Sequence, residues 1–281
     1  MELNITPLQL RLVLCTIQTQ VIDHSMNNRF SAVEDQFGSS PQFHAEKNSA
    51  FLRQEELENM LTKWHVLKRR VVGSAWQTQA GIACMLLYHL IWLELYICHD
   101  DVQAIAGKDG HTAAKPLLPQ LQRWAHSSSA WKAIAHVGQI FKLLQSSGGS
   151  NGSNAVLRPV WWPLAVSRVA LLVWCYGVGL RLSTGSTAGV DEAMLARSPT
   201  IILNDPEEDL DAHGKVIHEG EGIPCILAAD GKLTPLHCIS DFFDMCLKIL
   251  KDGKSKSSPL HESVHVFLAD MKRCGIPYSK V

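Results

Sequence analysis

The sequence predicts an all-α protein, a multi-helix bundle with one small irregular or hairpin insertion near residues 222–236. The main observation is that apolar residues recur at steps of three and four along several long segments, which places them on one face of a helix. The chain has 281 residues and is 46% hydrophobic, so it can bury a sizeable core. Segments rich in Gly, Ser and Asn, or in acidic residues, separate the predicted helices.

The N-terminal segment, residues 1–50, is expected to be partly irregular, and residues 51–275 are expected to form the helical domain. Thr6-Pro7 is typical of a helix start, with threonine as the cap and proline in the first turn. Gln9, Arg11 and later glutamines interrupt the apolar run that follows. We therefore do not expect a signal peptide.

The first helix of the domain is expected over Gln54–Val71, with an apolar stripe formed by Leu57, Leu61, Trp64, Leu67 and Val71. Lys68-Arg69-Arg70 near its end match the negative end of the helix dipole. We interpret them as a solvated helix end, and the alternative is a targeting or DNA-contacting patch. A long buried helix is expected over Gly73–Cys98, followed by a shorter one over Pro116–Trp124.

The segment 128–182 is predicted to form two helices joined by a Gly/Ser/Asn loop at 146–154. The residues that lie on one face of the first helix are Trp131, Ile134, Gly138, Phe141 and Leu144. The second helix follows a rigid entry, Arg-Pro-Val-Trp-Trp-Pro, whose last residue, Pro163, suits a first helical turn. We expect these residues to pack against other helices and not to act in catalysis.

The last third of the chain begins with an acidic loop at 204–222, whose formal charge is about −6. We interpret this loop as a linker, and the alternative is an interaction element. Asp230-Gly231 then predicts a tight turn between short apolar pieces. Two final helices are expected, one with Ile239, Phe242, Phe243, Cys246 and Leu250 on its apolar side, the other with Leu260, Val264, Phe267 and Met271.

Three regions resemble one family and follow the expected order, the first of them in two parts. Residues 131–140 read Trp-x-x-x-Ala-His-x-Gly-Gln-Ile, and residues 158–174 read Arg-Pro-x-Trp-Trp-Pro-x-Ala-x-x-Arg-x-Ala-Leu-x-x-Trp. Residues 85–107 hold Leu-Tyr-His, Asp-Asp and Ala-Gly, and residues 222–236 hold Gly-Ile-Pro, Asp-Gly and Pro-Leu. This pattern resembles the fungal-specific transcription factor regulatory domain of the xylanolytic activator type, over roughly residues 51 to 275.

The resemblance implies a nuclear protein that regulates transcription by RNA polymerase II. It implies zinc in a DNA-binding module, and this chain contains neither a zinc finger nor a binuclear zinc cluster. DNA is therefore an expected partner only through a module that is missing here, as in a truncated gene or a fingerless relative. Transcription co-regulators or a second copy of the chain are the other expected partners, and no cofactor is expected in this chain.

The charge balance and the cysteines agree with these expectations. The 26 Lys and Arg residues nearly cancel the 27 Asp and Glu residues, whereas an isolated DNA-binding module is usually clearly basic. None of the eight cysteines forms a C-x-x-C pair, and most lie inside apolar runs. We interpret them as buried free thiols of a reducing compartment, the nucleus in this case.

His261-Glu262-Ser263-Val264-His265 matches H-E-x-x-H, in which two imidazoles one helical turn apart bind zinc beside a glutamate base. The extended form would need Gly and His at the positions of Leu268 and Met271. His261 and His265 are therefore only weak metal candidates, and we expect no catalytic residues. A zinc-dependent hydrolase using residues 261–265 is the alternative function.

Other patterns are interpreted as structural. Gly148-Gly149-Ser150-Asn151-Gly152 matches G-x-S-x-G but lacks the strand and helix of a hydrolase elbow. His136 is expected to be a satisfied core histidine, and Asp100-Asp101 a solvent-facing helix end. Cys84–Cys98 and Val160–Leu182 are apolar, but their internal charges favour buried protein helices. A membrane-associated helical protein remains the second alternative, and we expect no membrane contact.

Overall fold

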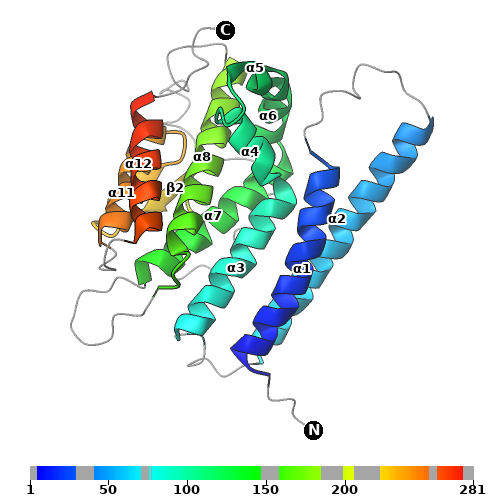
Figure 1. Ribbon diagram of the computed structural model, residues 1–281, viewed down its shortest axis with the longest axis horizontal. Helices are drawn as coiled ribbons and strands as arrows, with labels where there is room; N and C mark the ends of the chain where they lie inside the picture. The colour runs from blue at the N-terminus through cyan, green and yellow to red at the C-terminus, as the bar shows by residue number, and fades with distance from the viewer. Residues whose placement is uncertain are drawn as a thin grey trace.

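The structure is a computed structural model that describes residues 5–29, 41–70, 76, 78–146, 158–184, 199–205, 222–252 and 258–274. It is mainly helical, as predicted, with one small sheet. Helices α1 and α2 form one edge of the molecule and α11 and α12 the opposite edge, with α3, α7 and α8 between them (Figure 1). The predicted loop at 146–154, the G-x-S-x-G match and most of the acidic loop lie outside the described residues.

The N-terminal region is more helical than expected. Helix α1 spans Pro7–Asn27, and Thr6 caps it through a reciprocal pair of bonds with Gln9, which confirms the predicted start. Helix α2 spans Pro41–Lys68, so it begins 13 residues before the predicted Gln54. The sequence missed this first part because residues 41–53 have no regular apolar stripe.

The two N-terminal helices pack as an antiparallel pair. The indole N–H of Trp64 donates to the carbonyl of Leu10 at 2.9 Å, and Arg53 donates to the side chain of Gln20 at 2.9 Å. Of the predicted stripe, Leu57, Leu61 and Trp64 are buried and Leu67 is half-buried, while Val71 lies outside the described residues. Helix α1 also packs extensively on α3, which spans Gln79–Tyr96, so α1 lies between α2 and α3.

Helix α3 is buried along most of its length and is followed by a series of short helices. These are α4 at His99–Ile105, α5 at His111–Ala114, the 3₁₀ turn η2 at Lys115–Leu117, and α6 at Leu118–Ala125. Helix α7 then spans Ser128–Ser146 and packs against α3. The sequence analysis predicted α3, α6 and α7 but not α4 or α5, which are too short to show a helical period.

Helix α8, at Trp162–Thr184, is the centre of the second half of the fold. Pro163 stands in its first turn, as predicted. Helices α4, α6, α11 and α12 all pack against it. Helix α11 spans Ile239–Asp252 and helix α12 spans Pro259–Cys274.

The predicted hairpin is present, but it belongs to a three-stranded sheet. Strands β2 at Ile223–Leu227 and β3 at Leu233–Pro235 are antiparallel, and Gly231 takes a φ of 80° in the turn between them. Strand β1 at Thr200–Ile202 adds to β2 in parallel. The sequence analysis did not predict β1, which is only a three-residue strand far from its partner in sequence.

The apolar side of α12 agrees with the predicted one at Leu260, Val264 and Met271 but not at Phe267. Leu268 is fully buried, whereas Phe267 is 37% exposed. Both positions continue a helical stripe that begins at Val264, so spacing alone does not separate them. The position of α12 against α8 and α11 places Leu268 inside and turns Phe267 outward.

Candidate functional site

The H-E-x-x-H residues lie on α12, where the sequence predicted them to share a helix. The imidazole of His261 bonds the backbone carbonyl of Leu250 through Nε2 at 2.7 Å, so this ring connects α12 to the end of α11. His265 is half-buried one turn further on. Among the described residues, no group of three or more His, Cys, Asp and Glu side chains is arranged to hold a metal ion. The described residues therefore offer no zinc site of three protein ligands.

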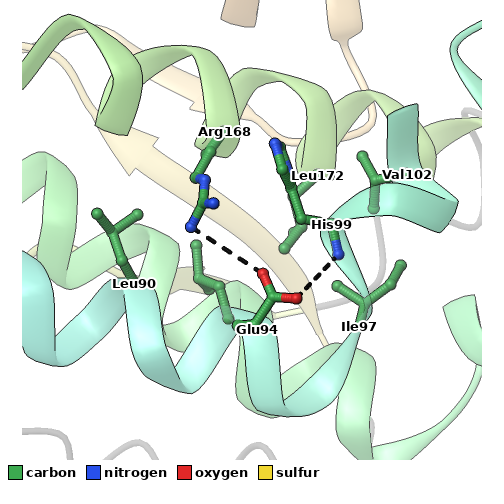
Figure 2. A pocket seen from close by; sticks show the side chains of 8 residues that line it. Leu90, Glu94, Ile97, His99, Val102, Arg168 and Leu172 are labelled. Atoms are coloured by element: carbon green, nitrogen blue, oxygen red, sulfur yellow. Dashed lines mark hydrogen bonds and ion pairs between the residues drawn. The ribbon is translucent and has the colours of Figure 1, made fainter. Parts of the chain in front are cut away.

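A polar junction occurs where α1, α3, α4 and α8 meet, around the carboxylate of Glu94. This side chain is only 13% exposed. It accepts a hydrogen bond from the hydroxyl of Ser25 at 2.9 Å and one from the backbone N–H of His99 at 3.3 Å. The guanidinium of Arg168 lies 4.0 Å away across the junction (Figure 2).

The junction opens into a small cleft whose other walls are apolar. Leu90, Ile97, Val102 and Leu172 are among its lining residues (Figure 2). Its volume is about 20 Å³, which is room for about one water molecule. The cleft can therefore hold a bridging water between Glu94 and Arg168, but it cannot enclose an organic substrate. Burial lowers the pKa of His99 to about 4, so this imidazole is neutral at pH 7.

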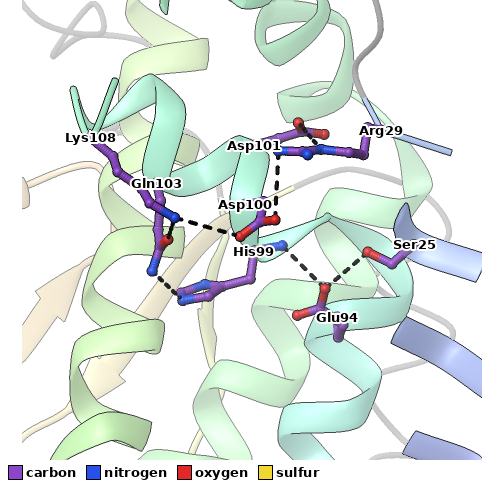
Figure 3. A network of polar contacts seen from close by, with 8 residues as sticks. All are labelled: Ser25, Arg29, Glu94, His99, Asp100, Asp101, Gln103 and Lys108. Carbon is purple, nitrogen blue, oxygen red and sulfur yellow. Dashed lines mark hydrogen bonds and ion pairs between the residues drawn. The ribbon is translucent and has the colours of Figure 1, made fainter. Parts of the chain in front are cut away.

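A second group of charges lies beside the junction, at the start of α4. Asp101 is buried, which corrects the prediction of a solvent-facing helix end. Its carboxylate pairs with Nε of Arg29 at 3.3 Å, while Asp100 is 3.7 Å from another guanidinium nitrogen of Arg29 (Figure 3). Both acids stand in the first turn of α4, where the helix dipole favours negative charge. Ser25 and Arg29 thus tie the end of α1 to α3 and α4.

We expect Arg29→Met to lower the free energy of unfolding by about 1–2 kcal/mol, because it leaves the buried Asp101 carboxylate without its cation. The value is below that of a fully buried pair because the side chain of Arg29 is 38% exposed. Asp100→Asn is the matched control, since its ion pairs are long and its side chain is 38% exposed. Urea unfolding measures both, and equal losses would contradict the assignment.

The third polar feature is a buried imidazole pair. Nδ1 of His89 on α3 lies 3.0 Å from Nδ1 of His136 on α7, so one ring donates and the other accepts. The ring of His136 stacks on Trp92 with a centroid distance of 4.9 Å. Burial lowers the pKa of His136 to about 3 and holds the pKa of His89 well below its usual range. His136 is therefore a satisfied core histidine, as predicted.

The basic residues at the end of α2 lie in two different environments. The ammonium of Lys68 lies 5.6 Å from the ring centroid of Trp76, a cation–π contact. Arg69 and Arg70 are exposed just beyond the helix. Three basic residues at a helix C-terminus complement its dipole. Nothing in their geometry selects a nucleic acid over solvent.

In the part of the chain that the structure describes, two helices are long and apolar enough to cross a membrane by length and composition alone, α3 and the part of α8 at Trp162–Leu182. In each, 78% of the most apolar window is buried inside the protein. Core helices of soluble proteins pass the same test, so this is weak evidence for a membrane. The charges that argued against a membrane span, Glu94 and Arg168, are two of the residues of the polar junction.

The described cysteines behave as separate thiols. Cys84, Cys98, Cys175, Cys225 and Cys246 are buried, Cys238 is half-buried and Cys15 is exposed. Burial raises the pKa of Cys84 to about 12 and that of Cys225 to about 11, so both remain protonated at pH 7.

We expect a thiol reagent at pH 7.5 to label Cys15 first among the described cysteines. The five buried thiols should react only as the chain unfolds, because the fold covers them. Mass spectrometry of peptides after a short exposure locates the label, and the Cys15→Ser variant is the control. Early labelling of Cys84 would contradict the packing of α1 on α3.

The polar junction as a unit was not predicted from the sequence. The available signal was a charge within an apolar helix, Glu94 on α3 and Arg168 on α8, which indicates a buried partner. The spacing along the chain does not show that the two charges meet, or that Ser25 joins them, because their helices are brought together only by packing.

Comparison with known proteins finds similarity to transcription factors. A transcription factor from Zymoseptoria tritici is 24% identical over 271 residues, which cover 91% of this chain and 27% of that protein. Transcription factor 1 from Elsinoe fawcettii is 25% identical over 262 residues, covering 90% of this chain and 25% of that protein. Transcription factor PfmaH from Pestalotiopsis fici is 24% identical over 175 residues, which are 62% of this chain and 17% of that protein.

The chain thus spans about a quarter of the length of the first two relatives. No protein-family model matches the chain, and no solved structure matches it. The similarity nevertheless extends over nearly all of the sequence in both of the longer alignments. The chain is a distant homologue of fungal transcription factors.

Proposed function

We propose that this chain is the regulatory, non-DNA-reading domain of a fungal transcription factor, which acts in the nucleus on transcription by RNA polymerase II. The observation that supports this proposal most directly is the alignment of about nine-tenths of the chain with about a quarter of each of two transcription factors. The motif pattern of the xylanolytic activator type over roughly residues 51 to 275 supports the finer assignment. DNA binding is then supplied by a zinc module, which the sequence of this chain does not contain.

The physical properties of the chain favour action through protein contacts. Its formal net charge is −1, so it has no general attraction for the phosphate backbone. The cleft at the polar junction is too small for a substrate. A helical domain of this kind acts through its surfaces, by recruiting co-regulators or by changing assembly. We therefore propose a regulator and not an enzyme.

The decisive experiment tethers the chain to DNA. The full chain is fused to an unrelated DNA-binding module, and a reporter gene with matching sites is measured in fungal cells. We expect reporter output to change several-fold in either direction relative to the module alone. A fusion carrying Trp64→Ala, which removes a fully buried core side chain, should lose the effect because the domain no longer folds. Unchanged output with a folded, nuclear fusion would contradict the proposal.

A second measurement separates DNA reading from regulation. Purified chain is mixed with random and promoter duplexes across a salt series, and bound zinc is determined on the same sample. We expect no sequence-specific shift and no stoichiometric zinc. A specific complex that survives high salt would show a DNA-reading surface in this chain. One zinc per chain, lost in His261→Ala, would instead support the hydrolase alternative.

A further inference from the structure

We draw no further inference here: the strongest candidate, the apolar surface patch of Leu8, Leu12 and Ile22 on the outer side of helix α1, carries nothing because the described residues do not show what covers it.

Discussion

Gly138→Val is expected to lower the free energy of unfolding by about 3 kcal/mol or more, the upper end of the range for overpacking a core. Gly138 lies on α7, and a side-chain carbon placed there would collide with the side chain and the backbone carbonyl of Leu203. The carbonyl cannot rotate away, so either α7 or the segment after β1 must move. Thermal and urea unfolding of the variant measure the loss.

Two comparison variants isolate this cause. Ser129→Val introduces the same β-branched residue at a half-buried position in the first turn of α7, and it should cost only a few tenths of a kcal/mol. Adding Leu203→Ala to Gly138→Val should recover little of the loss, because alanine keeps both the Cβ and the backbone carbonyl that collide. A Gly138→Val protein as stable as the Ser129→Val control would show that α7 and the β1 segment are not in close contact.

Acidification is expected to destabilise the chain strongly, because the His89–His136 pair cannot take up protons while it is buried. The pKa of His136 is about 3 in the fold, and that of His89 is well below 6.5. An unfolded chain protonates both near pH 6.5. Their contribution to stability is therefore complete above pH 6.5 and is lost as the pH falls toward the folded pKa values. Between pH 6.5 and 4.5 His136 should account for about 2 kcal/mol, and His89 adds to the loss in the same direction.

The measurement is the free energy of unfolding in urea at several pH values between 7 and 4.5. His24, His99 and His237 contribute in the same direction, since burial lowers their pKa values as well. The variant His89→Gln/His136→Gln keeps hydrogen-bonding groups but does not titrate. Its free energy of unfolding should depend less steeply on pH than that of the wild type. The difference in slope should correspond to the uptake of up to about two protons on unfolding. Identical slopes would mean that the imidazoles are not buried as a neutral pair.

Much of the local structure could be predicted from spacing alone. Thr6-Pro7 marked the start of α1, the period of apolar residues located α3 and α7, and Asp230-Gly231 located the turn between β2 and β3. Each of these depends on residues within about one turn of each other, where side-chain chemistry acts directly on the backbone. The errors concerned where a helix begins and which side of it is buried. Helix α2 begins earlier than predicted, and on α12 Leu268 is buried where Phe267 was predicted to be.

The sequence by itself determined that this is a helical protein of near-neutral charge, and it indicated the family that the distant homologues support. Only the tertiary structure decided which polar residues meet. It joined Ser25 to Glu94 across 69 positions, Arg29 to Asp101 across 72, and His89 to His136 across 47. No local pattern encodes such pairs, because they depend on how whole helices pack.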